Sequence, residues 1–249
     1  MFNTGLVSVS FRQLSPAKII DLTKAAGLSA IEWGSDVHAP PQDTENLQNI
    51  ARLGEKAGLF CSSYGTYFRL GVNRPEELIS YVCAANILGT KTLRLWCGDK
   101  PPSVLSPGEK TALLSDCKAA AETAEQNGVM LCLECHHGTY TEDPSAAADL
   151  MKAVNSPAFR MYWQPNQFVS TRENIRSAKL LSPFTENIHV FHWKGEKKHP
   201  LKQGIEVWRS YLSQFEEKGF LLLEFMPDDR PETLVREADS LKMIMGAKG

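Results

Sequence analysis

The sequence lacks the features that mark membrane proteins and nucleic-acid-binding proteins. No apolar run approaches the 18 residues of a membrane-spanning helix. There is no basic excess either, because 27 Lys and Arg residues stand against 29 Asp and Glu residues, which gives a formal net charge of −2. Binding to nucleic acid or to an anionic membrane surface requires clustered positive charge. We therefore expect neither a nucleic-acid partner nor a membrane partner.

Cysteine is also scarce. Six scattered cysteines in 249 residues are too few for a disulfide framework. Cys132 and Cys135 have the spacing of a CxxC pair, but residues three apart on a strand face opposite sides. We therefore expect no redox pair or zinc-thiolate pair there.

Two further motifs are missing from the sequence. No predicted strand leads into GxGxxG or GxxxxGK[ST], so the sequence supports neither a dinucleotide site nor a P-loop nucleotide site.

The first residues, MFNTGLVSVSFRQLS, carry no basic leader before their apolar stretch. They predict a first strand rather than a signal peptide, and hence a cytoplasmic protein.

Short β-rich runs alternate with longer amphipathic runs along the whole chain. Gly and Asn-Gly stops end several of the helical runs, and proline opens others. The predicted strands cover 4–11, 29–33, 59–64, 91–96, 129–134, 159–164, 187–192 and 220–225. The predicted helices begin near 16 and cover 43–57, 75–88, 107–126, 144–154, 172–181, 205–217 and 231–245. Eight βα units of about 31 residues with no linker predict a single (β/α)8 TIM barrel domain over 1–249.

Polar residues collect at the carboxyl ends of the predicted strands, where barrels of this kind carry their active sites. Glu134 and Glu224 each close an otherwise apolar strand, VMLCLE and FLLLEF. A carboxylate there either caps the strand with a basic partner or forms part of a site. Two carboxylates and an imidazole suit Mg²⁺, Mn²⁺, Co²⁺ or Zn²⁺. In NIHVFH the depth along the strand favours His192 as the imidazole, and His189 stays open as the alternative.

Aromatic residues gather at the same end of the predicted barrel. Trp33, Trp96, Trp163 and Trp193 all lie at predicted strand ends, whereas Trp208 lies in a helix. Aromatic faces around a polar pocket suit a sugar, although bulky side chains also plug barrel mouths. With the cationic and donor groups of the same rim, including Arg12, the candidate substrate-binding residues are Trp33, His38, Tyr64, Arg94, Trp96, His136, Trp163 and Lys194. A small carbohydrate is thus the predicted partner.

The motifs at the predicted strand ends, considered together, indicate a protein family. The sequence resembles the sugar phosphate isomerase/epimerase group of xylose isomerase-like barrels through IEWGSDVH, SSYGTYFRLG, LRLWCG, LECHHGT, YWQP, HVFHWKG and LLLEFMPDD. The resemblance implies one divalent metal ion held by Glu, Asp, His and Glu from the fifth to eighth strands. Glu134, His192 and Glu224 match this set, with His189 as the alternative histidine. Gln164 stands where the family has Asp, which removes one negative charge and lowers the expected metal affinity.

The resemblance also implies a mechanism. The metal would bind the carbonyl and hydroxyl of a ketose or keto-sugar, phosphorylated or not, and Glu134 and Glu224 would move protons through an enediolate. His136 and Lys194 would orient hydroxyl groups. The nearest alternative is a lyase or dehydratase acting on a keto-sugar or polyol at the same site. Loss of the metal through Gln164 would instead leave a non-catalytic sugar-binding barrel. Such barrels often associate, so a homo-oligomer is a further expectation.

Overall fold

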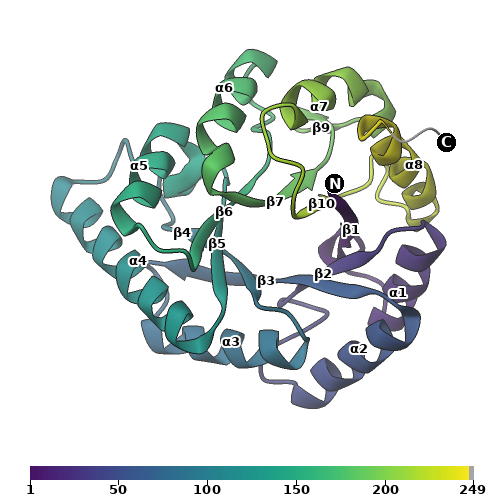
Figure 1. Cartoon of the computed structure of the whole chain (residues 1–249), viewed down its shortest axis with the longest axis horizontal. Coiled ribbons are helices and arrows are strands. Elements are labelled where there is room, and N and C mark those ends of the chain that lie inside the picture. The colour runs from purple at the N-terminus through teal and green to yellow at the C-terminus, as the bar shows by residue number, and fades with distance from the viewer. Residues whose placement is uncertain (247–249) are drawn as a thin grey trace.

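The computed structural model describes residues 1–246, and residues 247–249 of the predicted domain lie outside that range. Eight parallel strands close into a barrel in the order β1-β10-β7-β6-β5-β4-β3-β2 (Figure 1). They are β1 (Asn3–Val7), β2 (Ala30–Gly34), β3 (Phe60–Leu70), β4 (Thr92–Cys97), β5 (Met130–Glu134), β6 (Phe159–Trp163), β7 (Thr185–Val190) and β10 (Phe220–Leu223). Pairing of Asn3 with Phe220 through Leu6 with Leu223 closes the ring. The predicted (β/α)8 TIM barrel is confirmed.

Helices surround the barrel, as Figure 1 shows. They are α1 (Pro16–Ala25), α2 (Thr44–Ala57), α3 (Leu78–Ile87), α4 (Pro107–Asn127), α5 (Pro144–Val154), α6 (Thr171–Leu181), α7 (Ile205–Leu212) and α8 (Leu234–Ile244). Local sequence sets their ends. Ser106 and Ser170 each form a capping box with a glutamate three residues on, at the starts of α4 and α6. Gly58 ends α2 in the left-handed conformation that glycine adopts without strain. Among residues 1–246, none of the helices has the length and apolar content needed to cross a membrane.

Four strands differ clearly from the prediction. The third strand continues to Leu70, six residues beyond its predicted end. The first strand ends at Val7, and the 3-10 helix Ser8–Phe11 follows it. The seventh barrel strand begins at Thr185 and ends at Val190, two residues earlier at each end than predicted. A small hairpin then forms from β8 (Trp193–Lys194) and β9 (Lys197–Lys198). The last strand ends at Leu223, and Phe225 has a φ of 54°, which extended backbone does not adopt.

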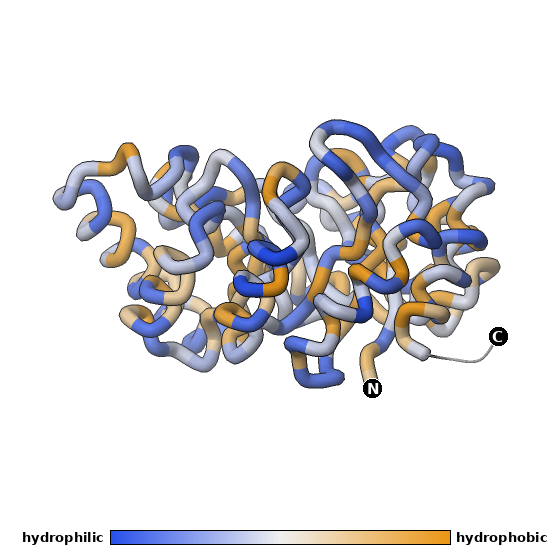
Figure 2. The backbone as a smooth tube through the Cα atoms, turned by 90° about the horizontal axis from the view of Figure 1, so that it is seen from above, coloured by the Kyte–Doolittle hydropathy of each residue, from blue (hydrophilic) through white to orange (hydrophobic). Residues whose placement is uncertain are grey.

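The barrel wall packs differently on its two sides because successive strand residues face opposite ways. Outward side chains, such as Leu93, Leu131 and Leu221, join one large apolar core against the helices. Inside the barrel, a smaller apolar cluster consists of Val7, Val9, Cys132, Tyr162 and Leu222. Figure 2 shows largely hydrophilic loops along the edge of the molecule opposite the N-terminus. All six cysteines are free thiols.

Candidate functional site

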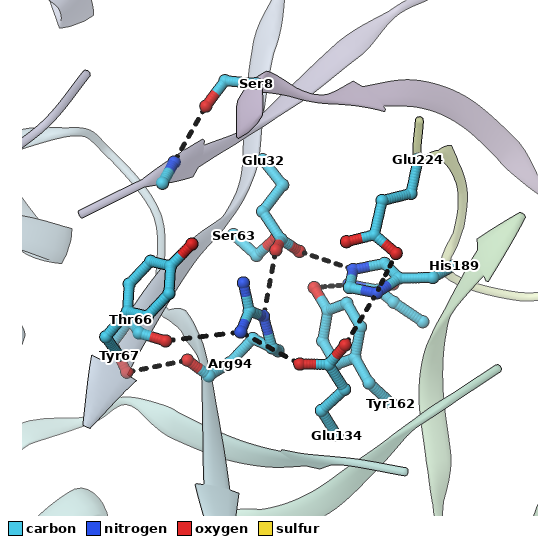
Figure 3. A network of polar contacts seen from close by, with 12 residues as sticks. Ser8, Glu32, Ser63, Thr66, Tyr67, Arg94, Glu134, Tyr162, His189 and Glu224 are labelled. Atoms are coloured by element: carbon cyan, nitrogen blue, oxygen red, sulfur yellow. Dashed lines mark hydrogen bonds and ion pairs between the residues drawn. The ribbon is translucent and has the colours of Figure 1, made fainter. Parts of the chain in front are cut away.

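The centre of the candidate site is the imidazole of His189, on the inner side of β7 (Figure 3). Three oxygens lie around its Nδ1 atom: Gln164 Oε1 at 3.2 Å, Glu134 Oε1 at 3.4 Å and Glu224 Oε2 at 3.6 Å. All three of Glu134, His189 and Glu224 are buried. Four neighbouring strands thus bring four polar side chains to one point, at the carboxyl end of the barrel.

The depth argument that favoured His192 is wrong. Because β7 starts at Thr185, His189 pairs in register with Leu222, only two residues before Glu224. His192 lies beyond the end of the strand, where its ring packs against Gly204 and against His199 with ring centroids 5.9 Å apart. The alternative left open by the sequence, His189, is the histidine that lies between the two glutamates.

The other ring nitrogen of His189 has its own carboxylate. Glu32 Oε2 lies 3.3 Å from His189 Nε2 and also accepts a hydrogen bond from Ser63 Oγ at 2.9 Å. A carboxylate at one imidazole nitrogen fixes the tautomer and leaves the lone pair of the other nitrogen free for a ligand. Glu32 therefore orients Nδ1 of His189 toward Glu134 and Glu224.

The guanidinium of Arg94 joins two of the carboxylates. Its Nε donates to Glu32 Oε1 at 3.2 Å, and its Nη1 donates to Glu134 Oε2 at 3.0 Å. Trp96 Nε1 donates to the same Glu134 oxygen at 2.5 Å, so Oε1 is the oxygen that faces His189. Gly65 makes room for this arrangement, because a Cβ atom there would lie 2.7 Å from Glu32 Oε1 and 2.8 Å from Arg94 Nη2.

The pKa shifts follow from this dense packing of charges. Burial alone would raise the pKa of Glu32, but the charges of His189 and Arg94 outweigh it and lower that pKa to about 2. Burial would lower the pKa of His189, yet Glu224 and Glu32 raise it to about 10. For Glu224, burial together with the charge of Glu134 raises the pKa to about 7, against the opposing effect of His189. The carboxylates therefore stabilise positive charge at the centre of the site.

This donor set fits a divalent cation. Glu134, His189 and Glu224 each offer one ligand atom, and these atoms lie within 4.8 Å of one another. Carboxylate oxygens and imidazole nitrogen suit Mg²⁺, Mn²⁺, Co²⁺ and Zn²⁺. Gln164 Oε1 adds a neutral oxygen beside Nδ1. A cation there would take the place of the proton that otherwise lies between His189 and its carboxylates.

A cavity of about 360 Å³ opens directly above these side chains. Six of the residues that line it are aromatic, namely Tyr67, Trp96, Phe168, Phe191, Trp193 and Phe225. Arg12 lies at its mouth, where Asp36 accepts a hydrogen bond from Nε at 2.7 Å and the Tyr67 hydroxyl contacts Nη2. The volume is within the range of small-molecule sites.

Comparison with known proteins agrees with this geometry. The family model described as "xylose isomerase-like TIM barrel" matches residues 20–244, which is most of the chain. The chain belongs to the xylose isomerase-like TIM barrel family. No curated protein matches it by sequence.

Solved structures with the same fold come from several bacteria. A probable 3-DHS dehydratase from Bacillus anthracis has a TM-score of 0.76 at 17% identity, over 97% of this chain and 99% of its own. A xylose isomerase-like protein from Mycobacterium smegmatis, in complex with magnesium, has a TM-score of 0.73 at 13% identity, over 99% of this chain and 98% of its own. A D-psicose 3-epimerase with D-tagatose from Clostridium cellulolyticum has a TM-score of 0.73 at 11% identity, over 99% of both chains. These identities are low, so the likeness concerns the fold.

Within this xylose isomerase-like barrel, several predicted sugar-binding residues lie outside the cavity. Trp33 is buried on the outer side of β2, and Tyr64 donates to Ala39 O on the outer side of β3. His38 contacts Ser8 Oγ and Leu14 O through its two ring nitrogens. Trp163 donates from Nε1 to Ser177 of α6 at 3.2 Å. Successive residues of a strand face opposite sides of the barrel wall. Trp33 follows the inward-facing Glu32, and Trp163 precedes the inward-facing Gln164, so both tryptophans face outward.

The remaining predicted residues divide between the cavity and the surface. Arg94, Trp96 and His136 line the cavity, as do Glu134, Gln164 and Glu224. Lys194 is exposed on the hairpin β8–β9. The sequence argument missed Glu32 and Ser63, although a glutamate inside the apolar run SAIEW is the same signal that singled out Glu134 and Glu224. Tyr67 carried no such signal, because the third strand is longer than predicted.

Proposed function

We propose that this protein is a divalent-metal-dependent enzyme that moves a proton on the carbon beside the carbonyl of a keto-sugar, and so isomerises or epimerises it. The observation that carries the proposal is the buried convergence of Glu134, Gln164 and Glu224 on Nδ1 of His189, below a cavity of about 360 Å³. A metal bound there would polarise the carbonyl and make the neighbouring C–H bond more acidic. The magnesium complex of the Mycobacterium smegmatis barrel supports a divalent ion in this fold.

The two glutamates supply the proton transfers. Glu134 ends β5 and Glu224 follows β10, and these strands are separated in the barrel by β6 and β7. The carboxylates therefore reach a bound sugar from different sides, as a base that removes a proton and an acid that returns one. Arg94 and Trp96 hold Glu134 in place through its Oε2 atom.

The cavity walls suit a sugar. Trp96, Trp193 and Phe225 present apolar faces to sugar C–H groups, and Arg12 and His136 offer donors to hydroxyl groups. The epimerase that binds D-tagatose, among the structures of the same fold, supports a small carbohydrate substrate. A probable dehydratase has the same fold, which favours elimination of water as the second candidate reaction.

Solvent exchange tests the proposal and separates the two reactions. The protein is stripped with EDTA, reloaded with Mn²⁺, and incubated in D₂O with a panel of keto-sugars. We expect Mn²⁺-dependent incorporation of deuterium beside the carbonyl without loss of water, detected by mass spectrometry and NMR. Mn²⁺-dependent loss of water would assign the lyase reaction instead. Absence of metal binding at millimolar Mn²⁺ would remove both and leave a sugar-binding barrel.

A pair of histidine variants tests the assignment of the ligand. We expect His189→Gln to weaken Mn²⁺ binding by about 100-fold or more, because an imidazole ligand and its Glu32 partner are lost together. His192→Gln is the matched control, since His192 lies outside the cluster and beside Gly204. Calorimetric titration of both apo-proteins with Mn²⁺ measures the difference. Equal affinities in the two variants would contradict the assignment.

A further inference from the structure

A second cavity, of about 300 Å³, adjoins the first. It lies between the start of α5 and helix α6, with Ser145 on one side and Ser177 and Leu180 on the other. His136, His137, Gln164 and Gln167 line both cavities. A single sugar ring above the metal ligands would therefore leave a cavity of similar size beside it.

The polar groups of the second cavity are mainly neutral. Within residues 1–246, no hydrogen bond is made by the Gln164 Nε2 atom, by the side-chain amide of Gln167 or by the Ser145 hydroxyl. Three charged side chains also line this cavity, namely Glu142, Glu173 and Arg176. Arg176 is exposed, and its charge acts on the Glu173 carboxylate. The two acidic groups already have partners. Glu142 pairs with His137 at 3.1 Å, and Glu173 accepts from Ser170 N at 2.9 Å. Free amide and hydroxyl groups of this kind recognise hydroxyl groups.

Gln164 connects the two cavities. Its Oε1 atom faces His189 Nδ1 at 3.2 Å, which leaves the Nε2 donor for a ligand. An aspartate at this position would be shorter and would carry no N–H donor. A glutamine here, unlike an aspartate, thus offers a donor at a position that lines the second cavity.

Two exposed rings lie at the rim shared by the cavities. His137 and Phe168 have ring centroids 5.5 Å apart, and Phe168 is 53% exposed. Val169, at 40% exposed, follows on the wall of the second cavity. These apolar faces suit a sugar ring that extends from one cavity toward the other.

We propose that the second cavity is a subsite for a neutral, hydroxyl-rich group attached to the reacting sugar, so that the substrate is a glycoside or disaccharide rather than a free monosaccharide. The inference rests on the proposed function, because the reacting sugar occupies the cavity above Glu134 and Glu224. It adds a contact surface that a free monosaccharide does not reach.

Binding measurements with defined sugars test the subsite. The Mn²⁺-loaded protein is titrated by calorimetry with glucose, glucose 6-phosphate, maltose, cellobiose, sucrose and trehalose. We expect at least one disaccharide to bind about tenfold or more tightly than glucose, since two additional hydrogen bonds together contribute about that factor. Val169→Trp fills the second cavity and is expected to abolish this preference while leaving glucose binding in place. Val235→Trp, at a 48% exposed valine of α8, is the matched control and keeps the preference.

Gln164→Glu provides an independent arm. It retains the Oε1 atom near His189 but removes the Nε2 donor, so we expect the ratio of disaccharide to glucose affinity to fall several-fold. Glucose binding with no disaccharide preference would overturn the subsite and leave the proposed function standing. Preferred binding of glucose 6-phosphate, lost in Val169→Trp, would overturn the neutral ligand. Failure to bind both Mn²⁺ and every sugar would overturn the proposed function and the subsite together.

Discussion

Replacing both Glu134 and Glu224 by glutamine is expected to remove the bound metal and to reduce solvent-proton exchange by about 10⁴-fold. Each substitution removes a carboxylate ligand and the group that moves a proton, and general acid–base groups contribute about 10²–10⁴-fold. The amide is isosteric, so Arg94 and Trp96 retain an acceptor at position 134. Elemental analysis and deuterium exchange of the purified variant measure the two effects.

The control for this double variant is Glu206→Gln. Glu206 lies on α7, with its side chain 82% exposed, and pairs with Arg209. We expect it to retain about one equivalent of metal and full exchange. A double variant that still binds one equivalent of metal would contradict the ligand assignment. One that loses the metal yet exchanges protons at the wild-type rate would contradict the mechanism alone.

Arg94→Met is expected to lower the free energy of unfolding of the metal-free protein by about 3–5 kcal/mol. The guanidinium is the buried partner of both Glu32 and Glu134, at 3.2 and 3.0 Å. Removing one member of a buried ion pair leaves an uncompensated charge, and here two carboxylates lose the same partner. Urea unfolding in the presence of EDTA measures the change without a contribution from bound metal.

Two further variants make this prediction specific. Arg74→Met removes an exposed arginine that pairs with Glu77 at 2.9 Å, and little change in unfolding free energy is expected because solvent screens that pair. Adding Glu32→Gln to Arg94→Met removes one of the two uncompensated charges, so part of the lost stability should return. If Arg94→Met unfolds at the same urea concentration as Arg74→Met, the buried network contributes nothing to stability.

Periodicity and turn residues predicted the architecture because they act locally. The alternation of apolar runs with amphipathic runs, and caps such as Ser106 and Gly58, depend on neighbours within a few residues. The predicted helix 144–154 agrees with α5, and 107–126 differs from α4 by one residue. An apolar strand that ends in a carboxylate was enough to identify Glu134 and Glu224.

Side-chain direction was harder to predict, because it depends on where each strand begins. A shift of two residues in β7 was enough to favour His192 over His189. Trp33, Tyr64 and Trp163 lie near the correct end of the barrel but on the outer side of its wall. The position of a residue along its strand sets how close its side chain lies to the end of the barrel. Whether that side chain faces inward or outward depends on whether the residue is an odd or an even number of positions from a residue that faces inward.

By itself, the sequence determined the eight βα units, the end of the barrel at which the buried polar cluster lies, and two glutamates of that cluster. Each of these follows from local patterns that any closed parallel barrel must satisfy. Only the tertiary structure decided that Glu32 supports His189, that Arg94 joins Glu32 to Glu134, and that Gln164 lies between two cavities. These contacts join residues up to 157 positions apart. Closure of the barrel brings them together, and no local pattern records that distance.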